Sequence, residues 1–159
     1  MLSQTTEYAL RAVVYLARDP DRARTSQEIA TGTHVPAGYL YKVLQALGKV
    51  GLVQSQRGLH GGFTLSRSPE HLTILQVVKA VDEVPRIHEC PVGLHKDRLC
   101  PLHRRLDEAM GALEKQLDQA TISMLLEEPG GCRPLCDDCN TDGKCKHGEL
   151  QKKPDLPVA

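Results

Sequence analysis

The sequence has few aromatic residues: no tryptophan, one phenylalanine and four tyrosines among 159 residues. Aliphatic side chains must therefore form any core, and 40% hydrophobic with 25% charged residues is a composition that excludes wholesale disorder. No apolar run reaches the roughly 18 residues that a membrane-spanning helix needs. The first 20 residues lack the basic segment and small-residue cleavage site of a signal peptide. We therefore expect a folded cytoplasmic protein without a membrane partner.

The sequence also lacks a formal net charge, because 20 Lys and Arg balance 20 Asp and Glu. Taken alone, this balance argues against nucleic-acid binding. The charges are unevenly distributed, however: residues 1–67 carry a net charge of +4 and residues 68–159 carry −4. No carboxylate lies between Glu28 and Glu70, where there are four Lys or Arg. This stretch is either an ordinary solvated surface or a surface that faces phosphates.

The first third of the chain predicts three helices. Residues 4–17 carry apolar side chains at helical spacing. Thr25-x-x-Glu28 is a capping box that begins a short second helix. Pro36 suits the start of a third helix, whose apolar residues repeat at helical spacing up to Val50. Two short helices joined by a tight turn are typical of a helix-turn-helix.

A β-hairpin is expected directly after the third helix. Residues 52–56 and 63–66 are strand-like and flank a loop with three glycines. The basic tip of this loop, Arg57 with His60, is typical of a wing that enters a minor groove. A helix-turn-helix followed by a basic hairpin is a winged helix. The candidate DNA-binding residues are Tyr39, Tyr41, Lys42, Gln45, Arg57 and His60.

Two further helices are expected beyond the hairpin. Thr73-x-x-Gln76 is a second capping box, which begins an apolar helix. Pro101 suits the start of a long helix, with apolar residues at spacings of four and three: Leu106, Met110, Leu113, Leu117, Ala120 and Met124. This heptad pattern predicts a homodimer; the alternative is a helix that packs only on its own domain. Gly111 weakens the prediction, because glycine costs about 1 kcal/mol in a helix.

These elements predict a mainly α fold with a small β-hairpin, in which a winged helix-turn-helix domain is followed by a long C-terminal dimerisation helix. The expected organisation is a DNA-binding domain over residues 1–84, a sensor loop over 85–103, the dimerisation helix over 104–128 and a cysteine-rich tail over 129–159.

The sensor loop has the composition of a metal site, with Cys90, Cys100 and three histidines within residues 87–103. Thiolates and imidazoles bind iron–sulfur clusters and zinc. Because the chain has no sign of export, metal binding or redox chemistry is favoured over disulfides for its six cysteines. Zinc at the same ligands and free, reduced thiols are the alternatives.

The tail contains a second cysteine group with the pattern Cys132-x3-Cys136-x2-Cys139-x5-Cys145. Four thiols at short spacings suit tetrahedral zinc or a four-thiolate iron–sulfur site. The alternative is a disordered tail with reducible thiols. We therefore treat the group as a candidate second metal site, with zinc as its candidate cofactor.

Several motifs along residues 1–127 resemble one known family. They are Leu2-Ser3-x-x-x-Glu7-Tyr8-Ala9-Leu10-Arg11-Ala12, Gly38-Tyr39-Leu40, Gly51-Leu52-Val53-x-Ser55-x-Arg57-Gly58, Gly61-Gly62-Phe63-x-Leu65 and Val77-Val78-x-Ala80-Val81-Asp82. On these residues the chain is similar to the bacterial winged-helix transcriptional regulators that include IscR and NsrR. The resemblance implies a homodimer that reads a pseudo-palindromic operator on double-stranded DNA, with an iron–sulfur cluster as its sensor.

The resemblance also implies a ligand set. Relatives typically place three cysteines in the sensor loop, whereas this chain has only Cys90 and Cys100. Cys100-x-x-His103 matches the end of the IscR-type site, and Glu7 lies where the NsrR-type helix supplies a carboxylate from the partner subunit. We therefore expect a 2Fe–2S cluster on Cys90, Cys100, His103 and Glu7. It would sense redox state, nitric oxide or iron–sulfur status.

Two other functions remain open at this point. One is a thiol- or zinc-dependent regulator without a cluster. The other is a redox or electron-transfer protein in which the winged domain serves only for docking. Catalysis is not expected, because no nucleophile–base pattern accompanies the cysteines and histidines.

Overall fold

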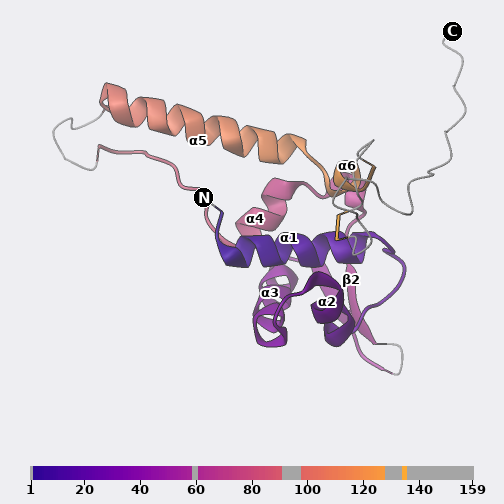
Figure 1. The fold of residues 1–159 in the computed structure, drawn as a ribbon. Coiled ribbons are helices and arrows are strands. Elements are labelled where there is room, and N and C mark those ends of the chain that lie inside the picture. The colour runs from indigo at the N-terminus through magenta and orange to yellow at the C-terminus, as the bar shows by residue number, and fades with distance from the viewer. Residues whose placement is uncertain (1, 59–60, 91–97, 128–133, 136–159) are drawn as a thin grey trace, which may run out of the picture.

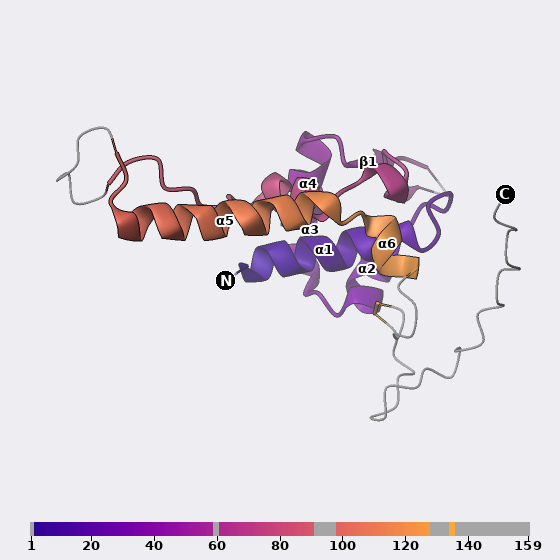
Figure 2. The ribbon, with the colours of Figure 1, turned by 90° about the horizontal axis from the view of Figure 1, so that it is seen from above.

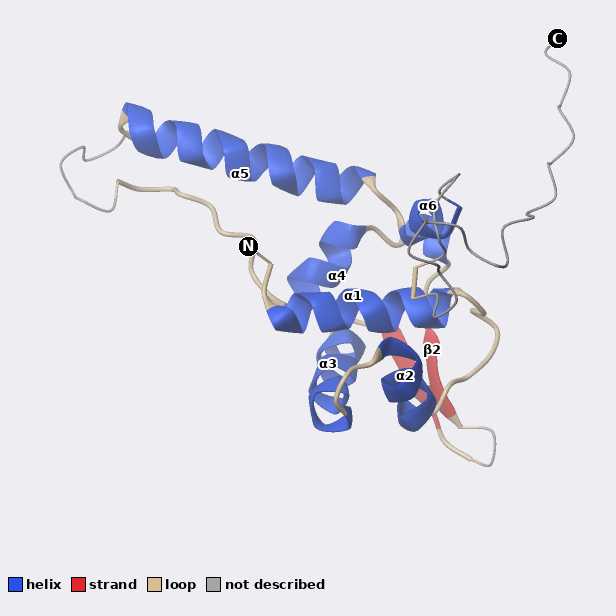
Figure 3. Ribbon diagram, viewed as in Figure 1, coloured by secondary structure: helices blue, strands red, loops and turns tan. Residues whose placement is uncertain are grey.

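The computed structural model of the chain describes residues 2–58, 61–90, 98–127 and 134–135. The helices and strands are α1 (Gln4–Ala17), α2 (Ser26–Thr33), α3 (Ala37–Lys49), β1 (Val53–Gln56), β2 (Gly62–Leu65), α4 (Ile74–Val81), α5 (Pro101–Gln119) and α6 (Ile122–Glu127), with a 3₁₀ turn at Pro69–His71 (Figure 1). Figure 3 shows the two strands beside α2, below α1. The predicted mainly α fold with a small β-hairpin is confirmed.

Helix α1 is the central helix of the winged domain. Its N-cap residue, Ser3, accepts a hydrogen bond from the backbone N–H of Thr6 (3.2 Å). Small and branched side chains on one face, including Ala9, Val13 and Leu16, are buried. The helix packs against α2, α3 and α4; in the view of Figure 1, α4 lies above α1 and α2 and α3 lie below it, and α4 also contacts α3. The core is therefore aliphatic, as the scarcity of aromatic residues requires.

Helices α2 and α3 form the predicted helix-turn-helix. The capping box is present: Thr25 Oγ1 accepts the N–H of Glu28 (3.2 Å), and the Glu28 carboxylate accepts the N–H of Thr25 (2.7 Å). Helix α2 is followed by His34, whose left-handed conformation (φ 53°) turns the chain toward α3. Leu40 and Leu44 bury one face of α3 in the core, so the opposite face remains exposed.

The wing is a two-stranded antiparallel hairpin. Val53 pairs with Leu65, and the register continues to Gln56 opposite Gly62. The wing is also attached to the segment before α2, because Phe63 and Arg24 exchange two backbone hydrogen bonds (2.8 and 3.0 Å). The base of the hairpin is therefore held in position by the rest of the domain.

Gly62 is expected not to tolerate a larger side chain. A Cβ atom there would lie 2.5 Å from the carbonyl oxygen of Arg24, because the Arg24–Phe63 hydrogen bonds bring these two segments of the backbone close together. We expect Gly62→Ala to lower the free energy of unfolding by about 1–3 kcal/mol, the usual effect of overpacking. Urea unfolding followed by circular dichroism measures this change.

Gly38→Ala is the matched control, because a Cβ at this exposed position of α3 has no atom within 4 Å. Gly38→Ala should unfold at the same urea concentration as the wild type or at a higher one, since alanine favours a helix. Equal midpoints for Gly62→Ala and the wild type would contradict the prediction.

Helix α4 begins at the second predicted capping box. Thr73 Oγ1 accepts the N–H of Gln76, and Gln76 Oε1 accepts the N–H of Thr73 (both 3.2 Å). Val77 and Val78 are buried, and α4 packs against α1. At the end of α4, the Asp82 carboxylate accepts a hydrogen bond from the Thr6 hydroxyl (3.0 Å). The two helices are therefore joined by both apolar and polar contacts.

The long C-terminal helix is present, but the prediction of one helix over residues 104–128 is wrong. Helix α5 begins at Pro101, as the proline indicated, but it ends at Gln119, and Ala120 has an extended backbone. Thr121 then forms a bridge with Thr73, with backbone hydrogen bonds on either side of it (2.9 and 2.8 Å). Ile122 begins α6 and is fully buried in the core. This pairing and burial are long-range interactions that interrupt the helix, so the predicted seam does not continue through Met124.

Helix α5 lies along the outside of the molecule and extends beyond the N-terminal end of α1 (Figures 1 and 2). None of its residues is buried in a single chain, and Leu102, Leu106 and Leu113 are 63%, 43% and 51% exposed. Of the helices in the described ranges, none is both long and apolar enough to cross a bilayer. The exposed leucines of α5 are therefore an unpartnered apolar face of a charged helix.

Candidate nucleic-acid interface and metal centre

The exposed face of α3 carries four of the six predicted DNA-binding residues. Gln45 Nε2 donates a hydrogen bond to Tyr41 Oη (3.0 Å). The Lys42 ammonium lies 5.9 Å from the centroid of the Tyr39 ring, which suits a cation–π contact. The Tyr39 ring also contacts Tyr8 of α1 edge to face, with 6.2 Å between centroids. The exposed side chains of α3 therefore contact one another in pairs, and Tyr39 also contacts α1.

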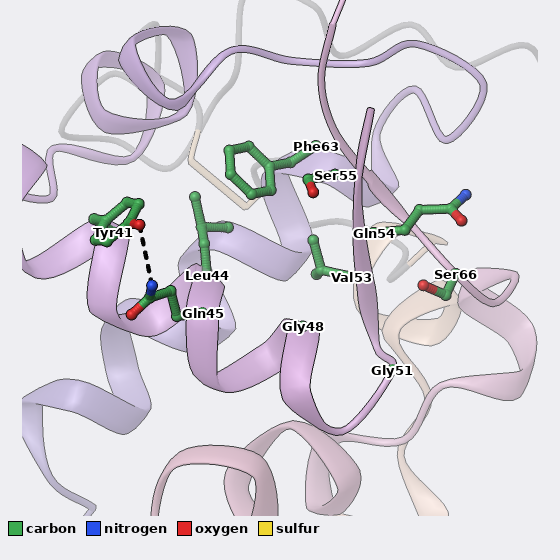
Figure 4. A pocket seen from close by; sticks show the side chains of 10 residues that line it. All are labelled: Tyr41, Leu44, Gln45, Gly48, Gly51, Val53, Gln54, Ser55, Phe63 and Ser66. Carbon is green, nitrogen blue, oxygen red and sulfur yellow. Dashed lines mark hydrogen bonds between the residues drawn. The ribbon is translucent and has the colours of Figure 1, made fainter. Parts of the chain in front are cut away.

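A groove lies between α3 and the wing (Figure 4). Leu44 enters it from α3, and Val53 and Phe63 enter it from the hairpin, so its interior is apolar. Tyr41 and Gln45 line it on the α3 side. The remaining lining residues are Gly48, Gly51, Gln54, Ser55 and Ser66. None of these described lining residues is charged, so the groove offers neutral hydrogen-bonding groups around an apolar interior.

The cations of the acid-free stretch lie close to groove-lining residues along the chain. Lys42, Lys49, Arg57 and Arg67 are all exposed. Arg57 directly follows β1, as expected for the start of a wing tip. The predicted contact at His60 lies outside the described residues. The described part of this surface can therefore attract a polyanion by its positive charge.

The structure brings three of the four predicted metal ligands together. His103 Nδ1 lies 3.1 Å from Cys100 Sγ and 3.7 Å from Cys90 Sγ, and all three ligand atoms lie within 4.8 Å of one another. Cys100 is the N-cap residue of α5, and His103 is the third residue of that helix. These two positions face each other at any helix start, which explains the short distance between their side chains. Cys90 lies in the segment that follows α4.

The donor chemistry of this group fits a thiophilic metal. Two sulfurs and an imidazole nitrogen suit zinc, which binds such ligands at about 2.0–2.3 Å. They also suit an iron–sulfur cluster in which histidine replaces one cysteine. All three residues are partly exposed, so a ligand from elsewhere could reach a metal held there. Cys90, Cys100 and His103 are therefore a candidate centre with three ligands from one chain.

Glu7 does not join these ligands within a single chain. The described group of close-lying metal-ligating side chains contains Cys90, Cys100 and His103 only. Glu7 lies in the first turn of α1, where its carboxylate forms an ion pair with Arg11. Its predicted role depends on a second subunit and stays a prediction.

An ion-pair network lies next to the candidate metal ligands along the chain, and the sequence did not predict it. Arg86 donates two hydrogen bonds to Asp107 (both 2.7 Å) and one to Glu114 (3.3 Å). Lys79 of α4 lies 2.6 Å from the other oxygen of Glu114. Hydrogen bonds from Arg86, and then from the N–H of Ile87, hold the pKa of Asp107 well below its usual range. A hydrogen bond from Lys79 lowers the pKa of Glu114, so both carboxylates are charged at neutral pH.

The signal for this network was only partly present in the sequence. His103, Asp107 and Glu114 share one face of α5 because they are four and seven residues apart. Nothing in the spacing indicated that Arg86, which lies outside the helices, would pair with Asp107 and Glu114. A polar helix face of this kind is usually assigned to solvent.

The candidate second metal site falls on Cys132, Cys136, Cys139 and Cys145, which lie outside the described residues. The described part of the tail is Pro134 and Leu135. The Pro134 carbonyl accepts a hydrogen bond from Arg18, and Leu135 packs against the core. The chain directly before Cys136 therefore contacts the winged domain.

Comparison with known proteins identifies the family. The family model "Rrf2: Iron-dependent Transcriptional regulator" matches residues 2–128. The chain belongs to the Rrf2 family of transcriptional regulators. This Rrf2 protein is 32% identical to the HTH-type transcriptional regulator NsrR of Geobacillus kaustophilus over 140 residues, which cover 84% of the chain and 95% of the relative. It is 33% identical to NsrR of Halalkalibacterium halodurans over 132 residues, which cover 79% of the chain and 89% of the relative.

Solved structures support the same fold for this Rrf2 protein. IscR of T. potens is similar with a TM-score of 0.68 and 21% identity, covering 80% of this chain and 86% of that one. CymR, the global cysteine regulator of B. subtilis, is similar with a TM-score of 0.66 and 23% identity, covering 77% of this chain and 93% of that one. The predicted resemblance is confirmed. The family consists of regulators and not of enzymes or electron carriers, so the electron-transfer alternative is set aside.

Proposed function

We propose that this Rrf2 protein is a homodimeric DNA-binding regulator controlled by an iron–sulfur cluster, of the 2Fe–2S type, at Cys90, Cys100 and His103. One observation carries the proposal: these three ligand atoms converge within 4.8 Å at the start of α5. The family description names iron, which agrees with two thiolates and an imidazole. Glu7 of the partner subunit would complete the site.

Each residue of the centre would have a separate role. Cys100 and His103 are held by the first turn of α5, so they would form the rigid part of the site. Cys90 comes from the segment after α4, so it would join the winged domain to that helix. The cluster, when bound, would supply sensitivity to redox state or nitric oxide. A change at the site would therefore act on the position of α5 relative to the winged domain.

The DNA-binding part of the proposal rests on the geometry of α3 and the wing. A recognition helix enters the major groove and a basic wing reaches the adjacent minor groove. Two copies related by a two-fold axis would read two half-sites, which requires contact between the subunits. The exposed leucines of α5 supply an apolar surface for that contact. A regulator of bacterial chromosomal DNA acts in the cytoplasm.

Operator binding is expected to depend on Lys42 and Gln45 in different ways. Lys42→Ala removes a phosphate contact, so the slope of log affinity against log salt concentration should become shallower by about 1 per subunit. Gln45→Ala removes an amide that can pair with adenine, so specific binding should weaken by about 1–3 kcal/mol and discrimination at one base pair should be lost. Fluorescence anisotropy with DNA from upstream of the protein's own gene measures both effects.

Lys115→Ala is the matched control, because this exposed lysine lies on α5, far along the chain from the recognition helix. It should leave both the affinity and the salt slope unchanged. Equal affinity of the wild type for random-sequence DNA and for every promoter fragment tested would reject the regulator proposal.

A thiol-based regulator is the second candidate. The Cys90 and Cys100 sulfurs lie within 4.8 Å of each other, close enough for a disulfide after a small movement. Closing it would transfer two electrons and two protons to an oxidant such as a disulfide. The relationship of the fold to CymR, titled a cysteine regulator, makes this candidate worth testing. The absorption spectrum of anaerobic protein separates it from the cluster proposal.

A further inference from the structure

We propose that Arg86 and Asp107 are positioning residues, forming a clamp that holds Cys90 against His103. The inference rests on the proposed metal site, because it assigns a role in building that site. Arg86 and Ile87 lie three to four residues before Cys90 in the chain, and Asp107 lies one helical turn after His103 on the same face of α5. The clamp is therefore adjacent to the ligands along both segments.

Asp107 receives three hydrogen bonds from the segment that carries Cys90. Arg86 Nε donates to Oδ1 and Nη2 donates to Oδ2, both at 2.7 Å. The backbone N–H of Ile87 donates to Oδ1 at 3.0 Å. A bidentate pair fixes the orientation of two planar groups, and the backbone hydrogen bond fixes the register of the chain itself. Farther along the same two segments, Cys90 Sγ lies 3.7 Å from His103 Nδ1.

Gly111 accommodates the guanidinium group. Three atoms of the Arg86 guanidinium lie 3.5 Å from the point where a Cβ of Gly111 would be. The flat group therefore rests on the helix backbone, one turn after Asp107. At 3.5 Å a Cβ would make ordinary van der Waals contact with the guanidinium, so Gly111 lies beside the Arg86 side chain without being required by it.

The clamp is also joined to the winged domain. Arg86 Nη1 donates to Glu114 Oε2 (3.3 Å), and Glu114 Oε1 pairs with Lys79 of α4 (2.6 Å). Helix α4 packs against α1 and α3. The position of the Cys90 segment is therefore set relative to both α5 and the DNA-binding domain.

Nearby ion pairs on α5 differ from this one. Glu108 pairs with Arg105 (3.2 Å) and lies 4.0 Å from Arg104, but these side chains are all on the same helix and at least half exposed. Such pairs contribute little and connect no separate segments. Glu108 is therefore a matched control for Asp107, with the same charge on the same helix.

The test uses the full-length chain, reduced and free of metal, with Ser in place of Cys132, Cys136, Cys139 and Cys145. Only Cys90 and Cys100 then carry thiols. Asp107→Asn, Arg86→Gln, the double variant and Glu108→Gln are compared. Urea unfolding verifies that each variant is folded under the conditions used.

The first measurement is a Co²⁺ titration followed by thiolate-to-metal absorption. We expect Asp107→Asn and Arg86→Gln each to weaken Co²⁺ binding about tenfold or more, as residues that orient ligands do. The double variant should be close to the weaker single one, because each single change already breaks the bidentate Arg86–Asp107 pair. Glu108→Gln should bind Co²⁺ with the same affinity as the four-serine chain without further changes.

The second measurement needs no metal. Oxidised glutathione is attacked by one protein thiolate, which releases one glutathione thiol. The other protein thiolate then displaces the second glutathione and closes the Cys90–Cys100 disulfide. We expect Asp107→Asn to slow this second step about tenfold, and Glu108→Gln to leave it unchanged, with quenched samples analysed by mass spectrometry.

The two measurements separate the clamp from the metal site. If Asp107→Asn has the same Co²⁺ affinity and the same rate of disulfide closure as Glu108→Gln, the clamp proposal is wrong. If the four-serine chain without further changes binds neither Co²⁺ nor iron, but Asp107→Asn still slows disulfide closure, the clamp is retained and the metal function is rejected. Additive losses in the double variant would show that Arg86 and Asp107 act independently, against the proposal.

Discussion

Cys100→Ala is expected to remove the visible absorption and the iron of anaerobically purified protein. The substitution deletes the sulfur closest to His103 Nδ1, at 3.1 Å, and leaves one thiolate in the described part of the site. A single thiolate with an imidazole is a poor ligand set for an iron–sulfur cluster, which thiolates normally dominate. Cys90→Ala should have the same effect. Absorption spectra together with iron and sulfide determination measure the loss.

The matched control replaces Cys132, Cys136, Cys139 and Cys145 with serine and leaves the centre intact. It should keep the absorption and the iron. Loss of colour in this control, with colour retained in Cys100→Ala, would assign the cluster to the tail. Colourless wild-type protein without iron would reject the cluster. One zinc per chain that Cys100→Ala removes would then indicate a zinc site, and no metal at all would favour the thiol regulator.

Leu106→Glu with Leu113→Glu is expected to convert the proposed dimer to monomers and weaken operator binding about 100-fold or more. Both leucines are substantially exposed in the single chain although they belong to an apolar stripe on α5. In the proposed dimer this stripe is buried against its copy, and burying unpaired carboxylates there is strongly unfavourable. Loss of the second half-site removes the avidity of a bivalent binder, which is typically about 10²–10⁴-fold.

Sedimentation velocity and anisotropy with operator DNA measure the two effects. Lys115→Glu is the control, because at about 100° per residue it lies on the opposite side of α5 from both leucines. It should remain dimeric. A dimeric Leu106→Glu, Leu113→Glu double variant would show that the subunits meet elsewhere, and a monomeric wild type with full operator affinity would reject the dimer.

Local hydrogen bonding explains why so much of the winged domain could be predicted. Both capping boxes, at Thr25 and Thr73, occur where the sequence indicated, because each involves groups three residues apart. The apolar repeat of α3 predicted its buried face, so the exposed positions of Tyr41 and Gln45 followed from the same period. Cys100 and His103 meet for a similar reason, as the N-cap and third residues of one helix.

Contacts between distant segments could not be predicted in this way. The break after Gln119 depends on pairing of Thr121 with Thr73 and on burial of Ile122, and neither changes the local helical pattern of the sequence. The contact of Arg86 with Asp107 likewise spans 21 residues. Local patterns identify which side chains share a face, but not which segment covers it.

The amino-acid sequence by itself therefore determined the aliphatic core and the helix-turn-helix with its basic wing. It also determined the division into a positively and a negatively charged part, and the cysteines and histidines before α5. These properties depend on residue type and on spacings of two to four residues. Only the tertiary structure decided that Cys90 reaches His103, that Arg86 and Asp107 join the two segments, and that Leu102, Leu106 and Leu113 stay exposed beside the described part of the chain. Those outcomes depend on how the ends of α4 and α5 are brought together, which packing of the whole chain sets.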